Sequence, residues 1–178
     1  GLLSPLRERY ITLAPRSVFV GHNRWMSTEV IIDAGGSNVR ISSPGKVVFP
    51  DRGWTKLDVA EHFTMCGVGA LRNVYNRPTM LKRWTKGVDA EPFYVKRVPS
   101  SARSTVDVAF PSARPGTMFL PLEVQDVVWL AQMNCLDLHP WNSRADDMEH
   151  ADELRIDLDP TDGFGFDAVI DVAHTVRS

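Results

Sequence analysis

The sequence lacks the features that define several common classes of protein. No apolar run approaches the ~18–20 residues of a membrane-spanning helix, so we expect no membrane partner. Two cysteines, Cys66 and Cys135, are too few for a disulfide framework and fit a reducing cytoplasm. Cys135 and His139 have no second ligand pair at zinc-binding spacing. Internal repeats and low-complexity tracts are also absent, so we expect a globular cytoplasmic protein.

Charge is distributed unevenly, although the formal net charge is only −2. Residues 46–103 contain eleven Lys/Arg and five Asp/Glu, whereas residues 123–171 contain two Arg and thirteen Asp/Glu. Such a division favours one region for a polyanion such as nucleic acid and another for metal cations. Uneven surface charge without a ligand remains the alternative.

The first 25 residues differ from the rest of the chain. They carry four arginines and one glutamate, and they have no apolar core of a secretory signal. We expect residues 1–25 to be a non-native or alternative leader, with Met26 close to the natural start. The fold is therefore predicted from residues 26–178.

Strand and helix patterns alternate irregularly, which predicts an α+β fold rather than regular βαβ units. Thr55 is expected to cap a helix, with Asp58 completing a capping box. Predicted helices cover 56–74, 122–134 and the residues from 167 onward. Predicted strands cover 39–43, 79–84, 93–98, 106–110 and 136–139, and the Pro/Gly-containing residues 111–116 are predicted to form a loop.

The stretch 154–160, Leu-Arg-Ile-Asp-Leu-Asp-Pro, alternates apolar and acidic residues and ends at a proline, which predicts a strand. Asp157 and Asp159 would lie on one face, about 6.6 Å apart at about 3.3 Å per residue, with Ile156 and Leu158 facing the core. At an effective dielectric near 20 the two charges would repel by about 2.5 kcal/mol. A divalent metal with oxygen ligands would relieve this repulsion, and two solvated acids are the alternative.

Lys46 and Lys56 flank a Pro/Gly-containing loop that leads into the first predicted helix. Free amide groups and the helix dipole favour an anion at such a position, and two lysines add charges suited to phosphate. Two solvated lysines are the alternative.

The predicted hairpin 79–98 interleaves basic and aromatic side chains. Basic residues that hold phosphates and aromatics that stack on bases together form a platform for single strands or templates. An aromatic core with a charged face would give the same pattern. The residues concerned are Lys82, Arg83, Trp84, Phe93, Tyr94, Lys96 and Arg97.

His139 ends a predicted strand 18 residues before Asp157. If the two strands were antiparallel neighbours, its imidazole would lie beside the carboxylates, in contact with metal or phosphate. A lone histidine is otherwise often structural.

Taken together, these segments resemble the polymerase domain of bacterial end-joining DNA ligases (ligase D) and its stand-alone relatives in the archaeo-eukaryotic primase superfamily. The resemblance covers roughly Val39 to the C-terminus. It is carried by motifs in the same order at compatible spacing: 43–50 (Ser-Pro-Gly-Lys-Val-Val-Phe-Pro), Thr55-Lys56, Arg77-Pro78, 81–84 (Leu-Lys-Arg-Trp), Gly87-Val88, 92–94 (Pro-Phe-Tyr) with Lys96, 138–140 (Leu-His-Pro) and 156–160 (Ile-Asp-Leu-Asp-Pro).

The resemblance implies nucleotide addition at gaps or broken ends, with ribonucleotides preferred, by a primase-polymerase-like mixed sheet with flanking helices. Asp157 and Asp159 would bind two divalent metals, Mn²⁺ or Mg²⁺, as catalytic residues together with His139. The other implied roles are 5′-phosphate binding by Lys46 and Lys56, and template contact by Phe93 and Tyr94.

The family's second motif, Ser-x-His, and its third acidic motif are not found in this sequence. We therefore expect the N-terminal portion of such a domain, as a fragment or a reduced relative, with weak or no polymerase activity. A non-catalytic module that recognises DNA ends, and an unrelated metal-dependent hydrolase with His139 as base, remain as alternatives. Expected partners are 5′-phosphorylated DNA, nucleoside triphosphates, and ligase and end-binding repair proteins near the bacterial nucleoid.

Overall fold

The computed structural model describes residues 17–18, 28–99, 102–110 and 113–177, and it confirms an α+β fold. Three α-helices and one 3-10 turn are present in these residues: α1 (Lys56–Val74), α2 (Val124–Gln132), α3 (Phe166–Arg177) and η1 (Pro50–Arg52). The strands are β1 (Ser17–Val18), β2 (Glu29–Asp33), β3 (Asn38–Ser42), β4 (Val47–Phe49), β5 (Trp54–Thr55), β6 (Thr79–Arg83), β7 (Phe93–Val95), β8 (Thr105–Phe110), β9 (Ala113–Phe119) and β10 (Cys135–Pro140).

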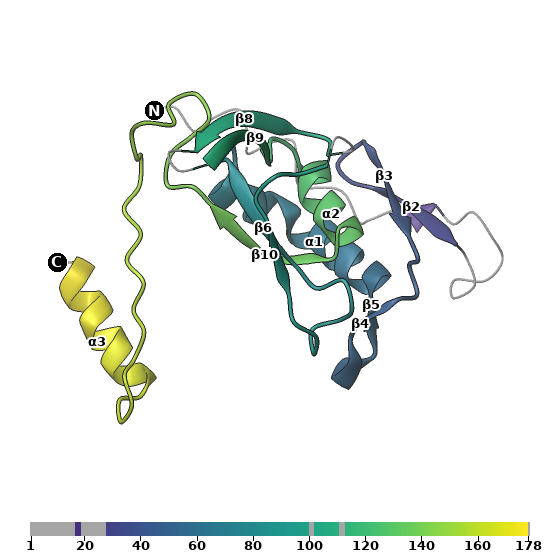
Figure 1. Cartoon of the computed structure of the whole chain (residues 1–178). Coiled ribbons are helices and arrows are strands. Elements are labelled where there is room, and N and C mark those ends of the chain that lie inside the picture. Colours follow the sequence, from purple (N-terminus) through teal and green to yellow (C-terminus); the bar gives the residue numbers. More distant parts are fainter. Residues whose placement is uncertain (1–16, 19–27, 100–101, 111–112, 178) are drawn as a thin grey trace.

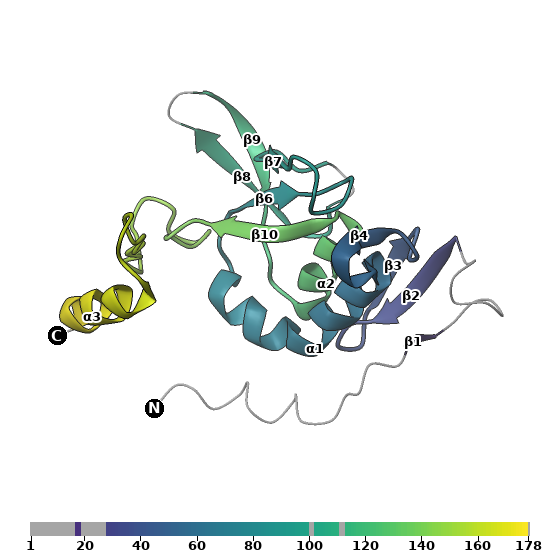
Figure 2. The ribbon, with the colours of Figure 1, turned by 90° about the horizontal axis from the view of Figure 1, so that it is seen from below.

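The central sheet has the strand order β10-β6-β9-β8, and β7 also pairs with β6. Helices α1 and α2 lie together on one side of this sheet (Figures 1 and 2). The core between them includes Leu57, Ala60, Leu81, Phe119 and Val128, all of which are buried. A second sheet, β1-β2-β3, and the short β4–β5 ladder lie at one end. None of the helices in the described residues is both long and apolar enough to cross a membrane.

Helix α1 begins and ends at the predicted residues, and its capping box is confirmed. The amide of Asp58 donates to Oγ1 of Thr55 at 3.3 Å, and the amide of Thr55 donates to the Asp58 carboxylate at 2.7 Å. The helix start is therefore encoded locally, which fixes the position of Lys56 as the first helical residue.

The predicted hairpin is also confirmed, because β7 pairs antiparallel with β6. Strands β3, β8 and β10 and helix α2 lie within one or two residues of their predicted bounds. In the predicted leader, Ser17 and Val18 pair with Ile32 and Ile31 of β2, and its other residues lie outside the described part of the chain.

The prediction that residues 111–116 form a loop is wrong, because β9 begins at Ala113 and pairs with β8. Pro115 lies where the register shifts between Val108 and Phe110, so its missing N–H removes no regular ladder bond. A proline is compatible with this strand because it lies at the register shift.

The prediction that residues 154–160 form a strand is also wrong. The segment is extended but unpaired, and Leu154 and Ile156 are 84% and 49% exposed. Alternation predicts which side of a strand is buried only if a partner strand and a covering layer exist. Here β10 pairs with β6, and no described strand covers the acidic segment.

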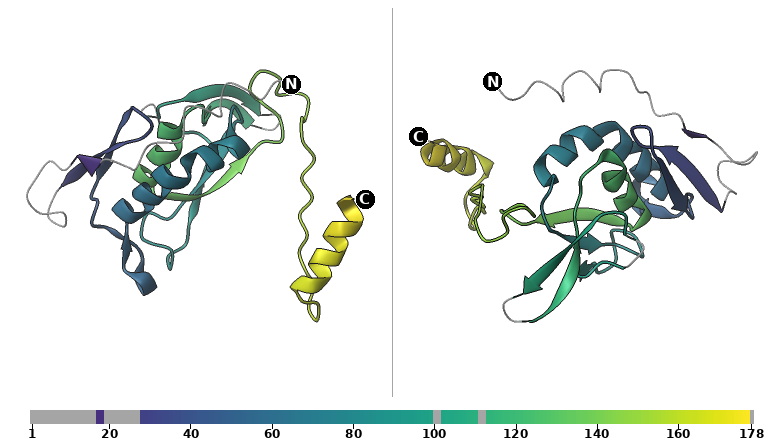
Figure 3. Two further views of the ribbon diagram at one scale, coloured as in Figure 1. Left: turned by 180° about the vertical axis from the view of Figure 1, so that it is seen from behind. Right: turned by 90° about the horizontal axis from the view of Figure 1, so that it is seen from above.

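Helix α3 forms where a final helix was expected, but none of its described residues is buried. It lies apart from the helices and the sheet, connected by the extended acidic segment (Figures 1 and 3). The apolar side chains of this helix therefore find no partner within the described part of the chain.

Candidate nucleic-acid interface

Three cations from separate elements lie close together, and we name Lys46, Lys56 and Arg83 the basic cluster. The Nζ of Lys56 donates to the carbonyl oxygen of Ser42 at 3.0 Å, and the Nζ of Lys46 donates to that of Thr85. Lys56 is only 4% exposed, although its head group carries a charge. The structure thus brings together both lysines that were predicted to bind phosphate, and adds an arginine.

The electrostatics of the basic cluster are unfavourable in the absence of an anion. Burial, followed by the charges of Lys46 and Arg83, lowers the pKa of Lys56 from 10.5 to about 8. Burial also lowers the pKa of Arg83. Cations that disfavour one another's charge in this way would be stabilised by a bound anion.

The amides at the start of α1 do not contribute to such a site, which corrects the sequence-based argument. They are occupied by acceptors from the chain itself. The acceptors are the carbonyl oxygen of Lys46 for Lys56, that of Pro44 for Leu57, and Oγ1 of Thr55 for Asp58. The side-chain cations, rather than free helix amides, supply the positive groups.

The basic and aromatic residues of the hairpin divide between the two faces of the sheet. Lys82 lies directly opposite Tyr94 across the β6–β7 ladder, and Arg83 lies opposite Phe93. Because consecutive strand residues point to opposite faces, the two pairs cannot form one platform. Lys96, just beyond β7, is exposed.

The pair Arg83–Phe93 lies on the face that carries the basic cluster. The guanidinium carbon of Arg83 is 5.3 Å from the Phe93 ring centroid, and its Nε donates to the Met133 carbonyl at 2.7 Å. Phe93 is 44% exposed, so its ring is accessible beside the cations.

The other face carries a row across three strands, which we name the Lys82 face: Lys82, Tyr94, Asp137 and His139. The Nζ of Lys82 lies 5.6 Å from the Tyr94 ring centroid and 3.5 Å from a carboxylate oxygen of Asp137. His139 packs edge-on against Tyr94, and its Nε2 lies 3.3 Å from Asp137. Asp137 therefore joins the predicted cation and the predicted histidine.

Asp157 and Asp159 are both exposed and lie on the unpaired acidic segment. Because the predicted strand is not formed, the expected antiparallel pairing with the strand of His139 is not formed either. Within the described ranges, no group of three or more His, Cys, Asp or Glu side chains is arranged to hold a metal. These two residues offer hard oxygen donors, but as a pair alone.

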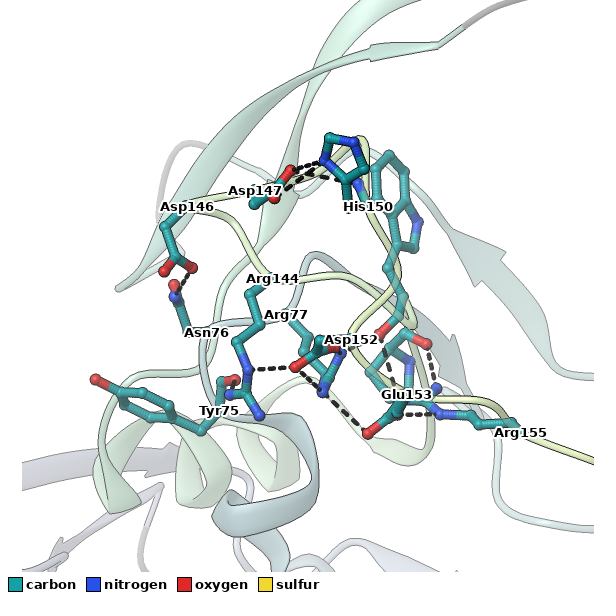
Figure 4. Close-up of polar contacts among 12 residues, drawn as sticks. Tyr75, Asn76, Arg77, Arg144, Asp146, Asp147, His150, Asp152, Glu153 and Arg155 are labelled. Carbon is teal, nitrogen blue, oxygen red and sulfur yellow. Dashed lines mark hydrogen bonds and ion pairs between the residues drawn. The ribbon is translucent and has the colours of Figure 1, made fainter. Parts of the chain in front are cut away.

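Sequence reasoning missed several polar residues around these sites. Asp137 could have been found, because it precedes His139 by two positions in a strand and must share its face. Arg77, which is fully buried, and Arg144 both contact Asp152 (Figure 4), and Arg155 contacts the carbonyl oxygen of Pro140. Their partners are distant in sequence, and no local pattern identifies them.

Comparison with known proteins identifies the class of this fold as a primase-polymerase domain. The family described as LigD, primase-polymerase domain matches residues 55–178. The chain therefore belongs to the LigD primase-polymerase domain family.

The relatives and the solved structure that resemble this chain carry the same name. The multifunctional non-homologous end joining protein LigD of Mycolicibacterium smegmatis is 31% identical over 144 residues, which cover 79% of this chain and 19% of that protein. The LigD of Pseudomonas aeruginosa is 28% identical, covering 71% of this chain and 15% of that protein. The chain thus spans less than a fifth of the length of these two relatives.

The polymerase domain of Mycobacterium tuberculosis ligase D, solved in complex with DNA, superposes with a TM-score of 0.54 at 31% sequence identity. The match covers 60% of this chain and 38% of that one. The fold predicted from the sequence is therefore shared with a solved polymerase domain.

Proposed function

We propose that this chain belongs to a DNA-repair primase-polymerase domain that adds nucleotides, preferably ribonucleotides, at gaps or broken ends. Membership of the LigD primase-polymerase family and the similarity to a domain solved with DNA support this proposal. The corresponding partners are DNA ends, nucleoside triphosphates, and the ligase and end-binding proteins of bacterial end joining.

The observation that carries the proposal is the buried ammonium of Lys56 beside two further cations. A terminal 5′-phosphate brings close to two negative charges and three acceptor oxygens. Placed at the basic cluster, it would offset the repulsion that lowers the pKa of Lys56 and accept hydrogen bonds from the lysines. An internal phosphodiester carries one negative charge and would offset less of the repulsion among these cations. The basic cluster would therefore prefer an end over continuous duplex.

The exposed aromatics would contact the nucleic acid from opposite faces of the sheet. Phe93 lies beside Arg83 on the face of the basic cluster, and Tyr94 lies beside Lys82 on the other face. Stacking on aromatic rings is tolerant of sequence, which suits a template strand that must vary. Lys96 would add a further phosphate contact.

Asp157 and Asp159 would hold divalent metal, Mn²⁺ or Mg²⁺, through carboxylate oxygens. Such ions, when bound, stabilise the attacking and leaving oxygens of an in-line phosphoryl displacement. The two described carboxylates fit part of this donor set. His139, whose Nε2 lies 3.3 Å from a carboxylate oxygen of Asp137, would contact the nucleotide phosphates.

Binding of gapped DNA with a 5′-phosphate or a 5′-hydroxyl on the downstream strand tests the assignment. We expect the unsubstituted chain to prefer the phosphate, Lys46→Ala and Lys56→Ala to lose the preference, and Arg72→Ala, an exposed residue near the end of α1, to keep it. Equal binding of both DNAs by the unsubstituted chain would overturn the phosphate role.

Primer extension with Mn²⁺ and ribonucleotides tests the chemistry, with Asp157→Ala/Asp159→Ala as the control. Extension that the control loses supports a polymerase. Absent extension with retained phosphate preference supports a second candidate, a non-catalytic DNA-end binding module. Both aspartates are exposed, and the described residues contain no group of three ligands arranged to hold a metal, which favours this candidate for the chain on its own.

A further inference from the structure

A cavity of about 450 Å³ lies beside the first turns of α1, and we name it the aromatic cavity. Its volume falls in the range of about 300–1,000 Å³ that is typical of small-molecule sites. The lining is mostly apolar and comes from β4, β5, α1 and β10. The lining residues are Phe49, Trp54, Asp58, Val59, His62, Phe63 and Leu136.

Two aromatic rings form one wall of the aromatic cavity. Phe49 and Trp54 pair across the β4–β5 ladder, and their ring centroids are 5.7 Å apart in an edge-to-face arrangement. Trp54 is nevertheless 53% exposed, so much of this large apolar side chain remains in contact with solvent. A flat ligand that stacked on Trp54 would remove this surface from water.

The aromatic cavity adjoins the basic cluster along the chain. Trp54 precedes Lys56 by two residues, about 6.6 Å along a strand at about 3.3 Å per residue. On the paired strand, Phe49 lies three residues after Lys46. Both lysines of the basic cluster are therefore close in the chain to an aromatic residue of the cavity wall.

The third cation of the basic cluster lies at the same boundary. Arg83 pairs with Cys135 across the β6–β10 ladder, and the next residue, Leu136, lines the aromatic cavity. The arrangement thus has two adjoining parts, a cationic one and an aromatic one. A terminal nucleotide has matching parts, because one sugar joins a phosphate of close to two negative charges to a flat base.

We propose that the aromatic cavity binds the base of the 5′-terminal nucleotide of the downstream strand, stacked on Trp54, while the basic cluster holds its phosphate. The inference rests on the proposed function, because it takes the basic cluster as the 5′-phosphate site. A base can enter the cavity only after it has left its pair in the duplex. The chain should therefore prefer an end whose terminal base is already unpaired.

Three gapped DNAs with the same downstream 5′-phosphate test this inference by fluorescence anisotropy. Their 5′-terminal nucleotide is paired with the template, mismatched, or abasic. We expect the unsubstituted chain to bind the mismatched DNA about tenfold more tightly than the paired DNA, since the unpairing cost is reduced. The abasic DNA should lose this gain, because it has no base to stack.

Variants of the cavity wall assign the effect to Trp54. Trp54→Ala should lose the preference for the mismatch, and Trp54→Phe, which keeps a ring, should retain part of it. Both should still prefer 5′-phosphate over 5′-hydroxyl on paired DNA, which also shows that they are folded. Tyr75→Ala removes an aromatic of similar exposure, 47%, at the other end of α1 and serves as the matched control.

A photochemical cross-link locates the base directly. A mismatched 5-iodouracil at the 5′ terminus should cross-link to the tryptic peptides 47–52 or 53–56, which contain Phe49 and Trp54 respectively. Peptide 87–96 contains the competing exposed aromatics Phe93 and Tyr94. A cross-link confined to that peptide would overturn the cavity assignment.

Equal binding of the three DNAs, or a mismatch preference that survives in Trp54→Ala, would also overturn the inference and leave the phosphate role intact. Equal binding of all three would favour an apolar segment of a partner protein as the occupant of the cavity. If the unsubstituted chain does not distinguish 5′-phosphate from 5′-hydroxyl on paired DNA, the proposed phosphate role fails and the inference with it. The two failures are therefore distinguishable.

Discussion

The backbone N–H of Lys56 donates to the carbonyl oxygen of Lys46 at 2.8 Å, so the two lysines are neighbours through their main chains as well as their charges. The two lysines are ten residues apart in the sequence, and the β4–β5 ladder, in which Val47 pairs with Thr55, brings them into direct contact. Backbone pairing therefore sets the positions of Lys46 and Lys56 relative to each other.

The first prediction concerns the pH dependence of phosphate recognition. With a pKa of about 8, the protonated fraction of Lys56 falls from about nine-tenths at pH 7 to about one-tenth at pH 9. The preference for 5′-phosphate over 5′-hydroxyl DNA should fall by up to about tenfold over this range. Lys56→Arg, whose guanidinium stays charged, should give a flat profile in the same fluorescence anisotropy titration. A flat profile in the unsubstituted chain would contradict the assignment.

The same pKa predicts a stability effect of defined sign. Because the folded pKa of Lys56 is lowered from 10.5 to about 8, the unfolded chain binds more protons between these values. The contribution of Lys56 to the free energy of unfolding should therefore increase as pH rises from about 8 to about 10.5. Urea denaturation of the unsubstituted chain and of Lys56→Met at each pH gives two free energies of unfolding, and their difference isolates this contribution. A difference that stays constant across this window would argue against the lowered pKa.

The division of the hairpin into two faces predicts separable effects on DNA binding. Lys82→Ala should weaken binding of 5′-phosphate and 5′-hydroxyl DNA equally and reduce the slope of log affinity against log salt by about 1. Lys46→Ala should act mainly on the phosphate-bearing DNA. Tyr94→Leu should lose about 1–3 kcal/mol of single-strand binding if a base stacks on the ring. Identical profiles for Lys82→Ala and Lys46→Ala would show that the two faces do not act separately.

The capping box of α1 predicts a local stability effect. Thr55→Ala should lower the free energy of unfolding by about 1 kcal/mol, since the amide of Asp58 loses its acceptor. Thr55→Ser keeps the hydroxyl and should retain most of the stability. Chemical denaturation of the two variants measures the difference, and equal losses would indicate that the methyl group matters rather than the cap.

The ion pairs of Asp152 with Arg77 and Arg144 predict a response to acid. Hydrogen bonds from Arg77, followed by those from Arg144, lower the pKa of Asp152 to about 2 from 3.8. The stabilisation is therefore present above about pH 4 and is lost as pH falls from about 3.8 towards 2. Asp152→Asn should be less stable than the unsubstituted chain at pH 6, with the gap narrowing towards pH 2. Asp51→Asn, an exposed control in η1, should show no such convergence.

Local patterns predicted much of the fold. The bounds of α1, its capping pair Thr55 and Asp58, and the β6–β7 hairpin depend on residues within a few positions or on one short connection. The prediction of a strand at residues 154–160 was wrong because an alternating pattern does not by itself provide a neighbouring strand for Ile156 to pair with. The prediction of a loop at residues 111–116 was wrong because Pro115 lies at a register shift, where a strand tolerates a proline.

The candidate site was predicted in part, for similar reasons. Lys46 and Lys56 were found together, but Arg83 was assigned to the template rather than to their cluster. Because successive residues of a strand point to opposite faces, the sequence alone could have placed Arg83 and Lys82 on different faces of the sheet. The bond between Arg77 and Asp152 joins residues 75 positions apart, and no pattern in a single sequence reports such a pairing.

The register of the hairpin limits how the connection 84–92 can change during evolution. A single-residue insertion that shifted the pairing by one would place Phe93 where Tyr94 now lies and exchange the aromatic that each face presents. A shift by two residues would keep Phe93 on the face of Arg83 and Tyr94 on the face of Lys82. Related chains should therefore vary freely in the composition of this connection, while changes in its length that alter the pairing register should come in even steps.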